Sequence, residues 1–153
     1  MSSGRRSWRW TPVVLWMALI FGLSSIARPP DVPGSGLPYF DKYVHGVLYA
    51  VLSALYIRAR TGGWLRPITL SVAVSAVIFS ILYGVTDEGH QYFVPPRQTD
   101  VSDLLADAIG AGVSAGVLTL ALYRLGITDT ALYDGSWSEW GQADGPPVAT
   151  GPA

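Results

Sequence analysis

Residues 71–83 read SVAVSAVIFSILY, a run that contains no charged side chain. A helix on the surface of a soluble protein shows polar residues at helical spacing on the face that meets water. This run shows no such face, and it lies within a longer apolar stretch from Pro67 to Val85. The missing polar face indicates that the solvent around this segment is lipid, and it argues against a soluble helical bundle.

Three further apolar stretches accompany this one, namely Trp10 to Ala27, Tyr43 to Ala59 and Leu104 to Leu125. Each stretch has roughly the 17 to 25 residues that a helix needs to cross a hydrocarbon core about 30 Å thick. Composition agrees, because only 14% of the 153 residues are charged, whereas soluble domains carry about 25%. We therefore expect an all-α, polytopic membrane protein with four transmembrane helices.

The arginines predict how these helices are oriented. They gather before the first stretch, in the connection between the second and third, and at the end of the fourth: Arg5, Arg6, Arg9, Arg58, Arg60, Arg66 and Arg124. The two other connections contain fewer positive residues. By the positive-inside rule, both termini then lie in the cytoplasm. We expect a multi-pass protein of the bacterial cell (inner) membrane.

Three regions follow from this reading. Residues 1–11 form a basic N-terminus, residues 12–125 the transmembrane domain, and residues 126–153 a polar cytoplasmic tail expected to be disordered. An alternative treats the first stretch as a signal peptide, since Ser25-Ile26-Ala27 has the small-x-small pattern of a cleavage site. Cleavage would leave three spans, but the arginine and two prolines directly after this site make it less attractive.

Composition also excludes several classes of function. The formal net charge is −1, so no basic field favours nucleic acid as a partner. The chain has no cysteine, which excludes disulfides, thiol catalysis and thiolate metal sites. It has no Gly-rich phosphate loop. We expect membrane lipids as partners, and neither a cofactor nor a metal.

Two polar segments interrupt the apolar pattern at the outer ends of the helices. In the first, Asp41, His45 and Tyr49 are spaced by four and share one helix face, with Lys42 beside them. The second segment begins with Asp87 and Glu88 and continues through Gln91, Pro95 and Arg97 to three aspartates, Asp100, Asp103 and Asp107. Their spacing places the three aspartates on one face of the fourth helix.

The fourth helix is therefore expected to pack on two sides. Gly110 and Ser114 continue the acidic face, so the side chains on this face are small toward the middle of the helix. On another side, Gly112 and Gly116 form a small-xxx-small pair that permits close backbone approach. Asp107 lies furthest inside, where an uncompensated charge costs at least a few kcal/mol.

The available counter-charges are Lys42, His45 and Arg97, and all belong to the same outer end. These considerations predict one polar cluster that joins the second, third and fourth helices.

The pattern Asp41-Lys42-x-x-His45-x-x-x-Tyr49 resembles the first hallmark of the VanZ-like family of bacterial membrane proteins. The second hallmark is similar to Asp87-Glu88-x-x-Gln91-x-x-x-Pro95-x-Arg97-x-x-Asp100-x-x-Asp103-x-x-x-Asp107-x-x-Gly110. The resemblance extends over residues 12–125 and its gaps are fixed, which makes it specific. The family often has Asn at the position of Asp107, so aspartate here adds a charge or a proton. The candidate functional cluster comprises Asp41, Lys42, His45, Tyr49, Asp87, Glu88, Gln91, Pro95, Arg97, Asp100, Asp103 and Asp107.

The resemblance names a family more firmly than a reaction. Its namesake gives low-level resistance to teicoplanin, a glycopeptide antibiotic, and no settled enzymatic activity belongs to the family. We expect the cluster to form a pocket for a lipid head group, a lipid-linked envelope precursor or a glycopeptide, which would accommodate the resistance given by the namesake. In such a pocket we expect Lys42 and Arg97 to contact phosphates, and His45, Gln91 and Tyr49 to bond sugar or amide groups.

Three other interpretations stay open. In the first, the cluster hydrolyses or transfers a group of an envelope lipid, with Asp87, Glu88 and a histidine (His45 or His90) moving protons. Carboxylates of this segment would then suit a hard divalent ion, although their spacing matches no metal motif. In the second, the charges only brace the external loops. Transport is the third, but four short helices leave little room for a path.

Overall fold

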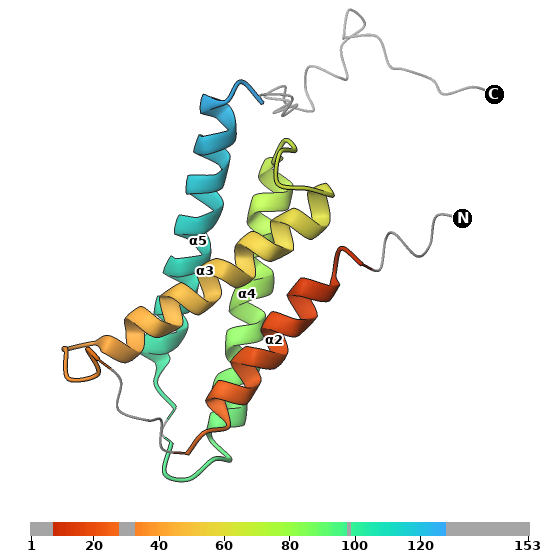
Figure 1. Ribbon diagram of the computed structural model, residues 1–153. Helices are drawn as coiled ribbons and strands as arrows, with labels where there is room; N and C mark the ends of the chain where they lie inside the picture. The colour runs from red at the N-terminus through yellow and green to blue at the C-terminus, as the bar shows by residue number, and fades with distance from the viewer. Residues whose placement is uncertain (1–7, 28–32, 98, 128–153) are drawn as a thin grey trace, which may run out of the picture.

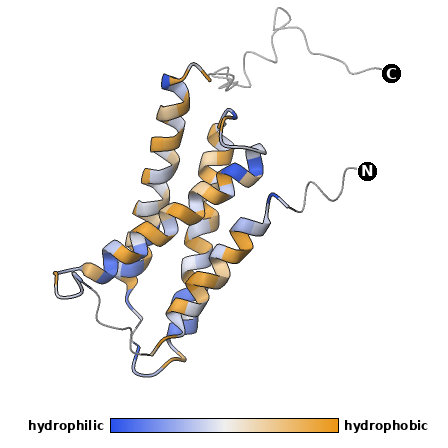
Figure 2. Cartoon of the chain, viewed as in Figure 1, coloured by the Kyte–Doolittle hydropathy of each residue, from blue (hydrophilic) through white to orange (hydrophobic). Residues whose placement is uncertain are grey.

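The computed structural model describes residues 8–27, 33–97 and 99–127, and these form helices and no strand. The helices are α2 (Thr11–Ser24), α3 (Phe40–Thr61), α4 (Leu70–Gln91) and α5 (Val101–Arg124). They run in alternating directions, so the ends of α2 and α4 and the starts of α3 and α5 gather at one end of the molecule (Figure 1). We call this the polar end, and Figure 2 shows hydrophilic residues there and hydrophobic ones along the helix middles. The all-α prediction is confirmed.

Helix length and composition differ from one helix to the next. α4 and α5, with 22 and 24 residues, are long and apolar enough to cross a membrane. α2 has only 14 residues, fewer than its apolar stretch of sequence. α3 has 22 residues, but charged residues at both of its ends lower its hydropathy. The basic N-terminus up to residue 7 and the tail from residue 128 lie outside the described residues.

Local signals explain where the helices begin and end. The side chain of Thr69 accepts a hydrogen bond from the backbone N–H of Val72 and caps α4. Asp100 caps α5 in the same way through the N–H of Ser102. Gly62, with φ of +85°, ends α3 in the left-handed conformation that glycine adopts most easily. Three helices extend beyond their apolar stretches, so most of the polar cluster lies on helices rather than on loops.

α3 and α5 approach each other backbone to backbone. A Cβ atom placed on Gly110 would collide with the backbone of Gly46. Further along the same contact, the Ser53 hydroxyl donates to the carbonyl of Ala111 at 3.1 Å, and both residues are buried. The small face that includes Gly110 therefore packs on protein, as the sequence predicts.

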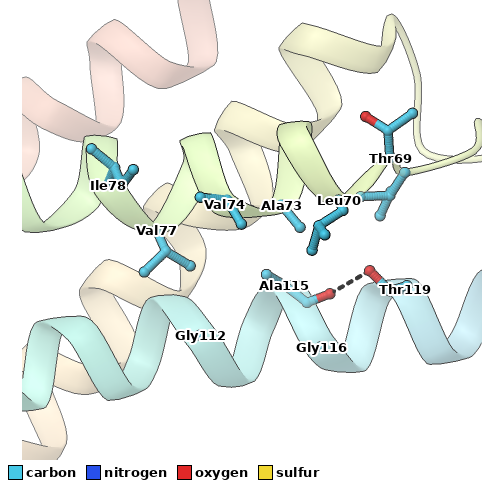
Figure 3. Close-up of a pocket in the computed structure, with 11 residues that line it drawn as sticks. Thr69, Leu70, Ala73, Val74, Val77, Ile78, Gly112, Ala115, Gly116 and Thr119 are labelled. Atoms are coloured by element: carbon cyan, nitrogen blue, oxygen red, sulfur yellow. Dashed lines mark hydrogen bonds between the residues drawn. The ribbon is translucent and has the colours of Figure 1, made fainter. Parts of the chain in front are cut away.

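The structure differs from the close approach expected at Gly112 and Gly116. A Cβ at either position would meet no atom within 4 Å. Both glycines line an apolar groove of about 570 Å³ between α4 and α5 (Figure 3). The expected close approach at this pair is therefore wrong. Larger side chains packed around Ile57 and Leu122 set the spacing of the helices here, so the missing side chains leave a groove rather than a contact.

The outer faces of α4 and α5 carry regular apolar stripes. The exposed residues on α4 are Leu70, Val74, Ile78, Leu82 and Val85, and those on α5 are Val101, Leu105, Ile109, Val113, Val117 and Leu120. They recur every three to four residues, which places each set on one face. Apolar patches of this extent are rare on soluble monomers and mark surfaces that meet lipid or protein.

The Gly46–Gly110 contact yields a prediction with a matched control. Gly110→Ala is expected to lower the free energy of unfolding by about 2 kcal/mol or more, because the added methyl group overlaps backbone that cannot move aside easily. Gly112→Ala adds the same group to open space, so its stability should be unchanged or slightly raised. Unfolding in detergent micelles, followed by circular dichroism, measures both. Equal losses in the two variants would contradict a specific α3–α5 contact.

Candidate functional site

Lys42 lies at the centre of an ion-pair network at the polar end. Its Nζ is 2.6 Å from Oδ1 of Asp103, 2.7 Å from Oδ2 of Asp100 and 2.9 Å from Oδ2 of Asp41. A lysine has three N–H donors, so these carboxylates account for all of them. The network ties the start of α3 to the start of α5.

The same network shapes the electrostatics of the loop that enters α5. The Lys42 ammonium holds the pKa of the Asp100 carboxyl well below its usual range. Asp100 therefore stays ionised down to unusually acidic pH, and it caps α5 as a carboxylate, which favours the helix N-terminus. Its backbone N–H donates to Oε2 of Glu88 at 3.0 Å. This bond fastens the loop back onto α4.

Asp107 lies deeper and has a different partner. It is only 1% exposed, and its Oδ1 is 3.0 Å from Nδ1 of His45. Gly84 of α4 makes room for it, since a Cβ there would lie 2.6 Å from Oδ2 of Asp107. The sequence suggested three counter-charges for this residue, and the structure selects His45. The placement of the Asp107 side chain thus depends on both α3, through His45, and α4, through Gly84.

Arg97 forms no ion pair with a carboxylate of the described residues. Its Nε donates to the carbonyl of Ile26 at 3.0 Å, and Nη2 donates to that of Leu23 at 3.2 Å. These carbonyls lie at the end of α2, where helix C-termini leave acceptors without intrahelical partners. Arg97 therefore fastens α2 to the loop between α4 and α5. Pro95 is exposed in this loop.

The two histidines also have separate surroundings. His90 stacks on Phe21 with ring centroids 4.2 Å apart, and its Nε2 is 2.9 Å from the hydroxyl of Ser25. These contacts join α4 to α2. His45 instead points into the cluster shared with α5.

A pocket of about 440 Å³ opens beside this cluster, between α2, α3 and the end of α4. Its lining residues are Ile20, Leu23, Ser24, Ile26, Ser35, Phe40, Asp41, Val44, His45, Leu48, Tyr49, Asp87, Gln91 and Arg97. Apolar side chains of α2 and α3 make up most of the wall. On α4, Gln91 Nε2 donates to Oδ2 of Asp87 at 3.0 Å, and both are buried. Volume and lining are typical of a site for a small amphiphilic ligand.

Several buried oxygens around the pocket and the cluster have no hydrogen-bond partner among the described residues. They are the hydroxyl of Tyr49, Oδ1 of Asp87, Oε1 of Glu88 and Oδ2 of Asp107. Native proteins rarely leave buried polar atoms unsatisfied without water, an ion or a ligand nearby. These atoms are therefore the ones most available for binding.

Sequence reasoning gathered the ionisable residues but missed the glycines that let them meet. Gly46 allows α5 to approach α3, and Gly84 leaves space for Asp107. The available signal was their position, since each lies within four residues of a cluster member on its own helix.

The ion-pair network predicts different costs for two of the Lys42 partners. Asp103→Asn removes the negative charge opposite Lys42 at a site that is 9% exposed, so the free energy of unfolding should fall by about 2 kcal/mol. Asp41→Asn removes the partner that is 62% exposed, and the loss should stay below about 1 kcal/mol. Chemical unfolding in detergent measures the difference. The network has no central role if both variants unfold like the unmodified protein.

Comparison with known proteins identifies a family but gives no solved structure and only short matches to curated proteins. No solved structure matches the chain. A segment of 54 residues is 49% identical to "Thiosulfate/3-mercaptopyruvate sulfurtransferase 2" of Arabidopsis thaliana, covering 34% of this chain and 16% of that protein. "Thiosulfate sulfurtransferase" of Gallus gallus is 38% identical over 63 residues, which cover 37% of this chain and 22% of that protein. The chain spans less than a quarter of either relative, so these short matches carry no argument about its activity.

The family comparison covers far more of the molecule. The model of the VanZ/LLP1 family matches residues 5–123, which include all four helices except the last residue of α5. Together with the apolar α4 and α5, this match indicates a membrane protein. The chain belongs to the VanZ/LLP1 family.

Proposed function

We propose that this chain crosses the bacterial inner membrane four times, with both termini in the cytoplasm. We further propose that the pocket at the polar end binds the head group of an envelope amphiphile. The amphiphile is a membrane lipid or a lipid-linked envelope precursor. The transmembrane domain in this proposal comprises residues 12–125.

The distribution of arginines supports the orientation. Arg58 and Arg60 lie in the last turn of α3, and Arg124 ends α5, all at the end of the molecule opposite the polar end. Arg9 reaches the same place, since a Cβ on Gly62 would lie 2.6 Å from its Nη1. Positive residues concentrated at one end mark the cytoplasmic side. The polar end then faces outward.

The short α2 is compatible with a crossing when its flanks are included. Fourteen residues rise only about 21 Å as a helix, less than the hydrocarbon core. Trp8 and Trp10 precede the helix and Ile26 follows it. Tryptophan favours the membrane interface, so Trp8 and Trp10 extend the span toward one surface. The apolar Ile26 extends it toward the other.

The observation that carries the ligand proposal is the combination of apolar walls with unpartnered buried oxygens. Asp87 and Tyr49 both line the pocket, are 4% and 0% exposed, and have oxygens without partners among the described residues. A carboxylate accepts hydrogen bonds and a phenol can donate or accept them. Hydroxyl and amino groups, as found in sugar and amine head groups, satisfy both.

This chemistry modifies the expected role of the two cations. All donors of Lys42 face carboxylates, and Arg97 bonds backbone carbonyls of α2. A phosphate contact through Lys42 would require breaking an internal bond. Arg97 uses only two of its five N–H donors in these bonds and lines the pocket, so it can contact a phosphate without losing them. We therefore assign recognition to Asp87, Tyr49, His45, Gln91 and Arg97. Lys42 has a bracing role only, whereas Arg97 also braces α2 through Nε and Nη2.

Native mass spectrometry of the full chain, extracted from bacterial membranes in mild detergent, tests the proposal. A co-purified amphiphile should be found, and Asp87→Asn and Tyr49→Phe should each lower its occupancy by about tenfold, the equivalent of one hydrogen bond. Tyr43→Phe is the matched control, because Tyr43 lies on the same helix with its side chain exposed. It should leave occupancy unchanged.

The other possible outcomes are informative too. Equal occupancy in all the folded variants would contradict recognition by this pocket. Displacement of the amphiphile by teicoplanin would identify a glycopeptide as a ligand of the same site. A change in the mass of the bound molecule on incubation would indicate catalysis instead.

A further inference from the structure

His45, Glu88 and Asp103 converge from three helices at the polar end. The ligand atoms that these side chains offer all lie within 4.8 Å of one another. Atoms around one ion with bonds near 2.1 Å are about 3 to 4 Å apart, so small side-chain rotations would close the set. One imidazole and two carboxylates, with no thiol, form a donor set that suits Zn²⁺ or Mn²⁺.

Each member of this triad makes one structural bond and has a second atom to offer. His45 uses Nδ1 toward Asp107, Asp103 uses Oδ1 toward Lys42, and Glu88 uses Oε2 toward the backbone of Asp100. Nε2 of His45, Oδ2 of Asp103 and Oε1 of Glu88 are the second atoms. Oε1 of Glu88 is buried and has no partner among the described residues. The bonds already made would hold the three ligands in place.

Asp107 adds a buried carboxylate directly behind His45. This side chain is 1% exposed, and its Oδ2 has no partner in the part of the chain that the structure describes. Its Oδ1 contacts His45, and it lies four residues after Asp103 on α5. Its Oδ2 points toward Gly84, four residues before Glu88 on α4. A carboxylate behind a metal-bound histidine is a recurring arrangement that orients the ring and strengthens the ligand.

The charge balance of the cluster also favours a cation. Asp41, Asp87, Glu88, Asp100, Asp103 and Asp107 bring six carboxylates to the cluster, against the fixed cations Lys42 and Arg97. Arg97 faces backbone carbonyls, so Lys42 alone pairs with carboxylates. Lys42 does repel a second cation, but its bond within the triad is to Oδ1 of Asp103, which leaves Oδ2 of that carboxylate for an ion. Near a membrane, such excess negative charge is costly unless it is neutralised.

We propose that His45, Glu88 and Asp103 bind one divalent transition-metal cation, with Asp107 orienting His45 as a positioning residue. The site lies beside the amphiphile pocket and shares His45 with it. It does not depend on that pocket, because neither Asp87 nor Tyr49 is among the ligands.

Mn²⁺ is the probe that tests this site, with the full chain in metal-free detergent. Electron paramagnetic resonance titration should show one bound Mn²⁺ per chain, and pulsed spectra should show ¹⁴N coupling from one imidazole. Glu88→Gln should weaken binding at least tenfold, and it keeps an oxygen for the backbone N–H of Asp100. Asp107→Asn should weaken it by about 10- to 100-fold, as loss of such an orienting carboxylate does.

Asp41→Asn is the matched control, since Asp41 also pairs with Lys42 but lies outside the triad. It should bind Mn²⁺ within twofold of the unmodified protein, and so should Tyr49→Phe, which separates this test from that of the amphiphile pocket. No Mn²⁺ bound at millimolar concentration, or no ¹⁴N coupling in the unmodified protein, would overturn the proposal whether or not the variants fold. Equal binding by folded Glu88→Gln would overturn it as well.

Discussion

The carboxyl group of Asp107, buried between three helices, is the constraint on which the polar end depends. An unpaired charge at this depth would destabilise the bundle by several kcal/mol. The structure compensates with His45 from α3 and with the space left by Gly84 on α4. Gly46 and Gly110 then bring α3 and α5 close enough for the pair to form. The packing of small residues and the placement of charge are therefore one feature of this fold.

In that geometry some charged residues hold the helices together, and others keep atoms that can bind a ligand. Lys42, which looks from the sequence like a ligand-binding cation, uses all its donors to hold α3 and α5 together, whereas Arg97 uses two of its five donors to hold α2. The acidic and neutral polar groups retain unpartnered atoms instead. A ligand that carries hydrogen-bond donors or positive charge would satisfy these atoms.

Much of the fold was predictable because lipid imposes a simple rule on sequence. Long apolar runs such as residues 71–83 predict helices without reference to their partners. The convergence of Asp41 to Tyr49 with Asp87 to Asp107 also followed, since both segments lie at helix ends on the same side. Spacing failed for Gly112 and Gly116, where a small-residue pair lines a groove. Small residues permit a close approach, but the larger neighbours decide whether it occurs.

The sequence by itself determined the helical class, the family and the set of ionisable residues, because these depend on composition and fixed spacing along one chain. Only the tertiary structure decided who pairs with whom. Lys42 with Asp103, His45 with Asp107, and Arg97 with the end of α2 are separated by 61, 62 and more than 70 residues. Partners so distant in sequence are chosen by helix packing at ångström scale. The same packing decides which polar atoms keep no partner and can bind a ligand, so these atoms could not be identified from the sequence pattern.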